Sequence, residues 1–433
     1  MKPRSPAQRS RWHRRVASPK PKRPLLHAGV LHATLLLLAA LAAHPSPVRA
    51  EKIYGPGVSD TEIKLGQTMP YSGPASGLGV EGKTDLAYFD MINEAGGVNG
   101  RRIRLISLDD GYSPPRTVEQ IRRLIEDEQV LALFKTLGTA PNSAVYRYVN
   151  AKKVPHLFIL SGAEKFRDPE GAPWTVPLIP AFTAEGRVFA RHVQSTNPNA
   201  RIAVLYQNDD LGKDLLKGLR QGFGASADTA IVAQASFELS DPTVDSQIIT
   251  LNSSGADTLV LFAVPRFVAQ ALKRSAAIGW KPLRLIASPS ANVEQVMKPV
   301  GLDVATGVLS VKWLKDPSDP TWKDDSGMRA YLAFMQRYNP GGDPKDWLNA
   351  NAYTGDQLIV EVLRRCGDDL SRENVMRKAL SLRDLELPML LPGIRVNISP
   401  EHHTPISQFQ LVRFDGMRWV PLGGISGDAT AGK

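Results

Sequence analysis

Between residues 63 and 125, short continuous runs of hydrophobic residues alternate with segments in which hydrophobic residues recur about every three positions. This alternation predicts strands and helices in turn. Ile63–Gly66 is a short apolar run that soon gives way to turn-forming residues, which is typical of a strand. Leu86, Phe89 and Ile92 then recur every three residues, as one face of a helix requires. The elements predicted here are strands at 63–66 and 103–108, and helices at 82–95 and after Ser113.

The same alternation continues to residue 287, with a proline-rich connection at 169–180 between two series of strands and helices. A strand, a helix and a second strand in this order form a parallel sheet with right-handed crossovers. Two such series predict two α/β lobes, with ligands bound beyond the carboxyl ends of the strands. The further strands are predicted at 130–134, 156–160, 202–206, 230–233, 258–262 and 285–287, with helices near 185–196, 212–223, 243–254 and 267–279. Helical patterns follow at 327–382, then short strands at 394–396, 406–414 and 419–422.

The first fifty residues differ from the rest in composition. They contain ten of the 53 basic residues and none of the acidic ones, and their apolar run at 31–43 is too short for a convincing membrane span. Val48-Arg49-Ala50 places small residues where a signal peptidase cuts. We therefore predict a secretory signal peptide over residues 1–50, with a membrane anchor as the alternative interpretation.

Removal of this leader changes the charge of the chain. It leaves 43 basic and 43 acidic residues, so the formal charge of +10 belongs to the leader. A role in binding nucleic acid or anionic membranes then loses its support from composition. Residues 51–433 are too many for one ordinary core and predict two domains. Cys366 is the single cysteine, which excludes an intramolecular disulfide and a cysteine-based metal site.

One short motif suggests nucleotide chemistry. Residues 77–84 (Gly-Leu-Gly-Val-Glu-Gly-Lys-Thr) match the P-loop pattern, in which backbone amides and the lysine hold a triphosphate. In a P-loop the first glycine follows its strand directly, whereas here eight residues (69–76) separate Gly77 from Thr68. We therefore interpret the motif as a glycine-rich loop before a helix, and keep a P-loop nucleotide-binding enzyme as a remote alternative.

Several segments in a fixed order resemble the leucine/isoleucine/valine-binding family of periplasmic proteins, the solute receptors of ABC importers. They are Leu-Gly-Gln-Thr at 65–68, Ser-Gly-Pro at 72–74, Asn-Glu-Ala-Gly-Gly-Val-Asn-Gly at 93–100, Asp-Asp at 109–110, and Arg-Ile-Ala-Val-Leu-Tyr-Gln-Asn-Asp-Asp-Leu-Gly at 201–212. The resemblance covers nearly all of the chain after the leader. It implies an α/β fold of two doubly wound parallel-sheet lobes joined by three crossings, the type I periplasmic-binding-protein fold.

The same resemblance implies where the lobes and the chain's partners lie. The crossings are expected near residues 181, 314 and 392, so the first lobe comprises 51–181 and 315–392 and the second lobe comprises 182–314 and 393–423. Residues 424–433 are rich in Gly, Ala and Thr, and this composition predicts a disordered tail. We expect a soluble monomer in the periplasm that delivers its ligand to an ABC importer permease in the inner membrane. A sensory protein that docks on a receptor or regulator is the second hypothesis.

The candidate anion site lies in loops that follow the strands of the first lobe. These loops place free backbone amides and small hydroxyls before helix N-termini, which favour anions. In the resembling family the matching loops bind the ligand's carboxylate, and by position Thr139, Ser161 and Ala163 fall on those contacts, the last without its hydroxyl. Ordinary helix N-caps are the alternative interpretation. The loop residues predicted to contact the ligand are Ser72, Thr139, Ala140, Ser161, Gly162 and Ala163.

Four further positions depart from the amino-acid-binding members of the resembling family. Leu78 stands where those members have an aromatic residue, and Leu211 and Val264 stand where they have tyrosines. Ser290 aligns with the acidic residue that neutralises the ligand's ammonium. Because a buried ammonium without a counter-charge is costly, these replacements favour an aromatic or aliphatic carboxylate over an amino acid. The alternatives are that another acid supplies the charge (Glu185, Asp209 or Asp210), or that Arg266 pairs with a second anionic group.

The sequence offers little for catalysis. The mature chain has no G-x-S-x-G or H-E-x-x-H motif. His402-His403 is the only adjacent histidine pair, and neighbouring residues on a strand point to opposite faces, so we expect no metal site there. The tryptophans are expected in core or rim packing, although one near the cleft could stack on an aromatic ligand. We therefore expect a binding protein without catalytic residues, cofactor or metal.

Overall fold

The computed structural model describes residues 15–20, 52–73 and 75–427. The chain divides into two units, Met1–Ala50 and Glu51–Lys433. In the first unit, residues 15–20 have no helix or strand, and the rest of the predicted signal peptide lies outside the described residues. Within the described part of the chain, no helix is both long and apolar enough to cross a membrane.

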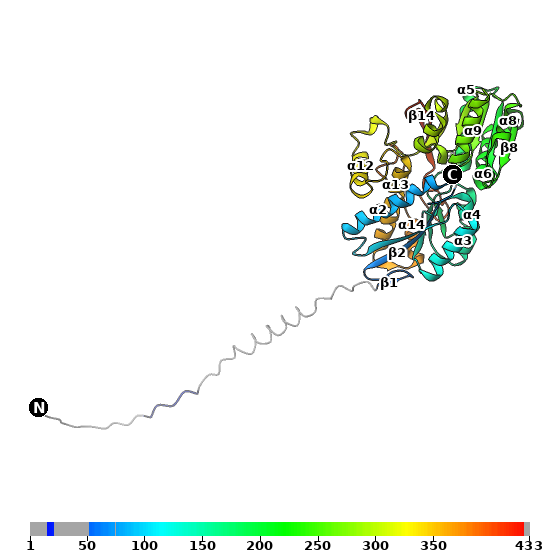
Figure 1. Ribbon diagram of the computed structural model, residues 1–433. Helices are drawn as coiled ribbons and strands as arrows, with labels where there is room; N and C mark the ends of the chain where they lie inside the picture. The colour runs from blue at the N-terminus through cyan, green and yellow to red at the C-terminus, as the bar shows by residue number, and fades with distance from the viewer. Residues whose placement is uncertain (1–14, 21–51, 74, 428–433) are drawn as a thin grey trace, which may run out of the picture. The chain divides into compact units, whose positions relative to one another are not determined.

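The first lobe is built on a five-stranded sheet in the order β3-β2-β4-β5-β6. Every neighbouring pair in it is parallel, as the alternation of strands and helices predicts. Helices α2, α3 and α4 lie in the same lobe as strand β2 (Figure 1). The strands are β2 (Glu62–Met69), β3 (Arg102–Asp109), β4 (Ala132–Phe134), β5 (His156–Ile159) and β6 (Thr175–Pro177). The helices are α2 (Val80–Glu94), α3 (Pro114–Arg122) and α4 (Thr139–Ala151).

The second lobe is built on a seven-stranded sheet in the order β14-β13-β11-β10-β9-β7-β8. Strands β7 to β11 are parallel, and all five residues of β9 are buried, as expected for a strand covered on both faces. The green helices α5, α6, α8 and α9 belong to this lobe (Figure 1). The strands are β7 (Ile202–Gln207), β8 (Ile231–Phe237), β9 (Thr258–Phe262), β10 (Leu283–Ile286), β11 (Leu309–Lys312), β13 (Gln408–Phe414) and β14 (Trp419–Gly427). The helices are α5 (Phe182–Thr196), α6 (Asp210–Phe223), α7 (Ala227–Ala230), α8 (Asp245–Asn252), α9 (Pro265–Ala277), α10 (Lys298–Val300) and α11 (Leu302–Ala305).

The chain passes three times between the two sheets. It first runs from β6 into α5; after β11 it returns to the first lobe, where α13 packs against α2 and β5; finally it runs back to β13. The second and third passages touch at an antiparallel bridge between Leu314 and Leu390. The elements between them are α12 (Ser326–Tyr338), α13 (Trp347–Cys366), β12 (Asp369–Leu370) and α14 (Arg372–Ala379).

The C-terminal part adds two antiparallel strands to the second sheet, because β13 pairs with β11 and β14 in antiparallel directions. Two predictions about this part were wrong. The predicted strand at 394–396 is a single bridge from Val396 to Leu385. Residues 424–427, which were predicted to be part of a disordered tail, belong to β14. Backbone hydrogen bonds to β13 form this strand, and such bonds do not require an alternating pattern of side chains. Residues 428–433 lie outside the described residues.

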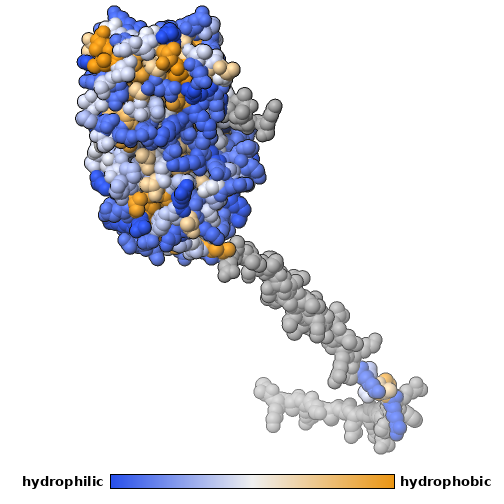
Figure 2. Space-filling view, turned by 90° about the vertical axis from the view of Figure 1, so that its right-hand side faces the viewer, coloured by the Kyte–Doolittle hydropathy of each residue, from blue (hydrophilic) through white to orange (hydrophobic). Residues whose placement is uncertain are grey.

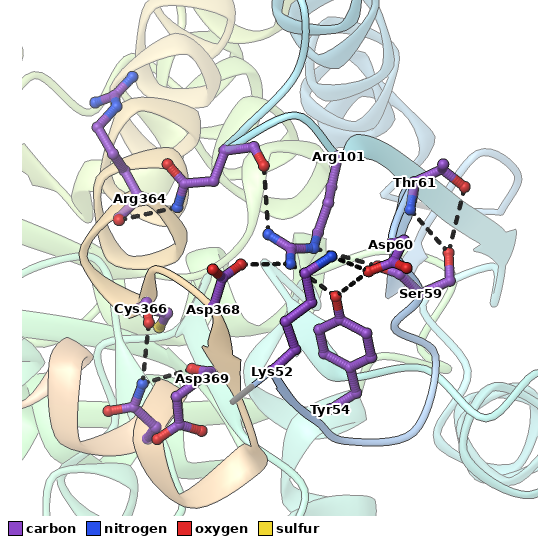
Figure 3. Close-up of polar contacts among 12 residues, drawn as sticks. Lys52, Tyr54, Ser59, Asp60, Thr61, Arg101, Arg364, Cys366, Asp368 and Asp369 are labelled. Atoms are coloured by element: carbon purple, nitrogen blue, oxygen red, sulfur yellow. Dashed lines mark hydrogen bonds and ion pairs between the residues drawn. The ribbon is translucent and has the colours of Figure 1, made fainter. Parts of the chain in front are cut away.

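One buried arginine, Arg101, holds the first described residues of the unit Glu51–Lys433 against the rest of the first lobe (Figure 3). Its guanidinium donates to the Tyr54 hydroxyl at 2.8 Å and to the Asp368 carboxylate at 2.7 Å. Tyr54 lies in β1 (Ile53–Tyr54), which pairs with β12, and its hydroxyl donates to Asp60 at 2.6 Å. Arg101 thereby connects the start of this unit to the turn after α13.

Figure 2 shows one face of the molecule, on which hydrophilic residues predominate and hydrophobic residues form small separate areas. Most of the large apolar side chains of residues 52–427 are buried. Those exposed by more than a third are far apart in the sequence: Ile53, Leu86, Ile249, Leu302, Leu332 and Met417. The apolar surface is therefore turned inward, toward the two cores and the space between the sheets.

Candidate ligand-binding site

A cavity opens between the two lobes where their strands end. The free space in it is about 500 Å³, part of which is open solvent. Six of its lining residues lie within a few residues after the end of a strand: Tyr112 after β3, Thr139 after β4, Leu160 after β5, Leu211 after β7, Val264 after β9 and Pro289 after β10. The carboxyl ends of strands from both sheets therefore face the same space, which is where ligands bind in folds of this class.

The polar end of the cavity is the start of α4. Gly138 precedes this helix with φ +103°, and a Cβ there would lie 2.5 Å from the Tyr112 ring, so this position requires glycine. The Thr139 hydroxyl hydrogen-bonds to the Ser161 hydroxyl at 2.8 Å, and the Ala163 amide donates to Ser161 at 3.3 Å. A helix N-terminus beside two hydroxyls suits the carboxylate of a ligand.

Tyr112 connects this end of the cavity to the second lobe. Its hydroxyl lies beside the Thr139 backbone amide and the Gln207 side chain. Its backbone is in the left-handed region at φ +58°, a conformation that costs free energy for a residue with a large side chain. Burial raises the pKa of the Tyr112 phenol, so its hydroxyl stays protonated and can donate to an anion.

One wall of the cavity carries a buried acidic residue, Glu81. Its Oε2 atom lies 3.3 Å from Lys135 Nζ, and the Asn351 amide donates to both carboxylate oxygens at 3.2 and 3.1 Å. Lys135 also pairs with Asp85 at 2.5 Å, and Asp356 lies beside this pair. Burial raises the pKa of Glu81 to about 7 and that of Asp356 well above its ordinary value. Among these four ionisable side chains, only Glu81 lines the cavity.

The remaining walls are apolar and aromatic. Trp313 and Trp347 pack edge to face with ring centres 5.9 Å apart, and both come from the chain that follows β11. Their indole N–H groups are buried and have no hydrogen-bond partner among the described residues. Phe182, the first residue of α5, lies on the wall near the crossing between the lobes. An aromatic or aliphatic ligand would thus be covered by side chains of its own kind.

The structure brings four of the ten predicted site residues to the cavity: Leu78, Thr139, Leu211 and Val264. The six others do not line it. Ser161 bonds to Thr139, Ala163 is buried behind Ser161, Gly162 packs against Phe182, Ala140 lies in the first turn of α4, and the Ser290 hydroxyl donates to the Ala263 carbonyl at 2.7 Å. Ser72 is exposed, and its hydroxyl donates to Asp109 at 2.6 Å.

The charged residues considered as alternatives do not line the cavity either. The Glu185 carboxylate accepts two hydrogen bonds from Ser288, and Asp209 caps α6 by accepting from the Leu211 and Gly212 amides. Asp210 pairs with Lys165 at 2.5 Å. The Arg266 guanidinium donates to the Pro242 carbonyl at 3.0 Å. Each of these groups therefore already has a structural contact.

The sequence of residues 62–418 matches the model of a family described as periplasmic binding protein. The chain belongs to the periplasmic binding protein family. A curated relative, the Leu/Ile/Val-binding protein homolog 7 of Brucella suis biovar 1 (strain 1330), is 23% identical over 369 residues, which are 82% of this chain and 87% of the relative. The expected resemblance to the leucine/isoleucine/valine-binding proteins is thereby confirmed.

Solved structures confirm the type I fold of this periplasmic binding protein. A branched-chain amino acid ABC transporter protein from Thermus thermophilus with bound valine superposes with a TM-score of 0.76 at 16% identity, covering 86% of this chain and 98% of its own. A solute-binding protein of an ABC transporter from R. palustris in complex with benzoate has a TM-score of 0.72 at 19% identity, covering 86% and 99%. Neighbours that share this fold were thus solved with an amino acid and with an aromatic acid.

Several lining residues were not among the predicted site residues. Glu81 lies three residues after Leu78, about one helical turn away, so its place beside a predicted contact could have drawn attention to it. Tyr112 follows Asp109-Asp110 in a loop that the strand pattern had already placed at the ligand end of the sheet. Trp313 and Trp347 come from the second passage between the lobes and the start of α13, where no sequence pattern indicates contact with the cavity.

The P-loop match at 77–84 does not form a phosphate-binding loop in this binding protein. Residues 76–79 are a short 3-10 helix and α2 begins at Val80, so the segment is nearly continuous helix. Lys83 is exposed, and the Thr84 hydroxyl is bonded to Asn349 at 2.7 Å. Among the described residues, no three His, Cys, Asp or Glu side chains are grouped to hold a metal ion.

Proposed function

We propose that this periplasmic binding protein is the solute receptor of an ABC importer, and that it closes its two lobes on a small carboxylic acid. The observation that carries the proposal is the cavity between the carboxyl ends of both sheets, with the start of α4 and the Thr139 hydroxyl at its polar end. The predicted export signal and the family together support a periplasmic location, with the importer's permease as the partner.

The composition of the walls supports an acid with an apolar or aromatic body. Burying apolar ligand surface against Leu78, Leu211 and Val264 gains about 25 cal/mol for each Å² removed from water. The position expected to hold an ammonium counter-charge is Ser290, whose hydroxyl donates to a backbone carbonyl. A buried ammonium without a partner costs on the order of several kcal/mol. Glu81, the carboxylate on the cavity wall, already pairs with Lys135, so both terms favour an acid that lacks the α-amine over the amino acid with the same side chain.

Matched ligand pairs test this proposal. Thermal unfolding of the protein lacking residues 1–50 is measured with 3-phenylpropionate against phenylalanine, and with 4-methylpentanoate against leucine. A ligand at a hundred times its dissociation constant stabilises the folded state by about 2.7 kcal/mol, which raises the melting temperature. We expect the acid to raise it more than the amino acid in both pairs. A larger rise with both amino acids would contradict the ligand class, and no rise with any small acid would contradict the function.

A further inference from the structure

The cavity wall contains a hydrogen-bond acceptor, the Glu81 carboxylate, that lies away from the place proposed for the carboxylate of the ligand. Glu81 lies in the first turn of α2, whereas the carboxylate end is the start of α4. The Glu81 side chain is 4% exposed and lines the cavity. It is the one carboxylate among the described lining residues, so a polar group on the body of a bound ligand would meet it there.

Glu81 has capacity for one more hydrogen bond. Lys135 and a hydrogen-bond donor on the ligand both favour the ionised form of Glu81, and an ionised carboxylate has about four acceptor positions on its two oxygens. Lys135 approaches Oε2, and Asn351 contacts both oxygens, which accounts for three of them. Lys135 and Asn351 also fix the orientation of the carboxylate, so its remaining acceptor position is held in place before the ligand arrives.

Burial around Glu81 favours a neutral donor over a cationic one. Lys135 Nζ is 3.3 Å from the Glu81 carboxylate and 2.5 Å from Asp85, so Asp85 balances much of the charge that Lys135 brings to Glu81. A ligand ammonium bonded to Glu81 would be a second buried cation beside Lys135 and would lose its hydration shell on entry, which is costly. A hydroxyl loses much less hydration free energy on entry. Glu81 therefore suits an O–H group on the ligand.

We propose that Glu81 determines specificity by accepting a hydrogen bond from a hydroxyl on the body of the ligand, so that the ligand is a hydroxylated carboxylic acid. The inference rests on the proposed function, because it assigns the carboxylate to the start of α4. A site that bonds a ligand hydroxyl discriminates strongly against the analogue that lacks it, since the buried acceptor is then left without that partner.

The first experiment needs no variant. Calorimetric titration compares 3-phenylpropionate with its 2-, 3- and 4-hydroxyphenyl analogues, and phenylalanine with tyrosine. We expect at least one hydroxylated acid to bind ten or more times tighter than 3-phenylpropionate. Equal or weaker binding of all three hydroxylated acids would overturn the inference while leaving the carboxylate site intact. Absence of binding by every acid would overturn the proposed function as well.

The second experiment uses Glu81→Gln, which keeps the size of the side chain but removes its charge, with Glu94→Gln on the exposed end of the same helix as a control. Glu81→Gln should reduce the advantage of the hydroxylated acid about tenfold and leave 3-phenylpropionate within threefold of wild type. An equal loss for both ligands would mean that Glu81 only supports the fold. If phenylalanine is the ligand whose affinity falls selectively, the donor is an ammonium and the hydroxyl assignment is wrong. If the Glu81→Gln protein does not fold, the titration of the wild-type protein with the hydroxylated acids alone decides whether the inference holds.

Discussion

The Thr139 hydroxyl and the Ser161 hydroxyl lie 2.8 Å apart at the start of α4, with the Ala163 amide bonded to Ser161 behind them. Both hydroxyls are buried, yet the Thr139 side chain reaches the cavity. A simple N-cap accepts hydrogen bonds from amides of its own helix, whereas Thr139 is the first residue of α4 and its hydroxyl bonds to Ser161. This arrangement favours the interpretation of Thr139 as a ligand contact over that of an ordinary cap.

Changing Thr139→Val tests this interpretation, because valine has nearly the same shape and lacks the hydroxyl. We expect the binding of the acid to weaken by about 1.5–3 kcal/mol, the range for a hydrogen bond to a charged group, with thermal unfolding close to wild type. Calorimetry measures the loss. Thr250→Val, at an exposed helical position that bonds only to the Ser246 carbonyl, is the control. Wild-type affinity in Thr139→Val would remove this residue from the site.

Glu185 gives a prediction about pH. It is fully buried and accepts its hydrogen bonds from Ser288, and burial raises its pKa from 4.5 to about 7. Because the folded state holds the proton more tightly than the unfolded state, Glu185 contributes most stability below pH 4.5, and this contribution is lost as the pH rises to 7. Each pKa unit corresponds to about 1.4 kcal/mol, so the loss is roughly 3 kcal/mol.

Urea unfolding of Glu185→Gln and wild type at pH 4.5 and pH 7.5 measures this loss. Glutamine cannot ionise, so the variant should gain stability relative to wild type as the pH rises. Glu119→Gln, at an exposed position on α3, should show no such change relative to wild type. A difference between Glu185→Gln and wild type that stays constant across this pH interval would show that Glu185 does not titrate there.

Among the elements, α5 and α6 make the most extensive helix contact in the second lobe, and glycines allow it. A Cβ on Gly218 would lie 2.1 Å from the Thr183 carbonyl oxygen, and one on Gly186 would lie 2.3 Å from the Leu215 carbonyl oxygen. The two backbones therefore touch directly. This contact fixes the first turn of α5, which carries Phe182 of the cavity wall and Glu185.

Gly218→Ala should separate these two helices. Alanine gains up to about 1 kcal/mol in helix propensity, but the clash is with backbone atoms that cannot rotate away, and overpacking typically costs about 1–3 kcal/mol, occasionally more. We expect a net loss of about 2 kcal/mol in urea unfolding. Gly341→Ala, in a loop where nothing lies within 4 Å of the added Cβ, should stay near wild type. Equal stabilities of the two variants would show that the helices can separate without cost.

The bounds of strands and helices could be predicted from the sequence wherever a single segment has a clear pattern of hydrophobic residues. The buried strands β7 and β9 and the amphipathic α6 have such patterns, and their predicted bounds differ from the observed ones by at most two residues. The antiparallel pairing of β13 and β14 was missed, because it depends on which distant strand each one meets. For the same reason Leu78 and Thr139 could be predicted from local loops, whereas Trp313 and Trp347 reach the cavity only through tertiary structure.

In the whole molecule the two lobes also touch outside the cavity. The Gln295 side chain of the second lobe donates to the Gly77 carbonyl of the first at 2.7 Å, and a Cβ on Gly77 would lie 2.4 Å from that side chain. Asp210 of α6 meets Ser143 and Lys165 of the first lobe at 3.1 and 2.5 Å. Such polar contacts on separate segments can form and break as the lobes move about the three passages. The cavity would then open for entry of the ligand and close around it, as in hinge motions of this type.

X-ray scattering of the protein lacking residues 1–50 tests the central claim most directly, since closure on a small acid changes the size of the whole molecule. The radius of gyration is measured without ligand and at increasing concentrations of the acid that gives the largest thermal shift. We predict that it falls and then stays constant once the site is saturated, and that Thr139→Val requires a higher concentration of the acid for the same fall. A saturated protein whose radius of gyration is unchanged from the ligand-free value would contradict closure.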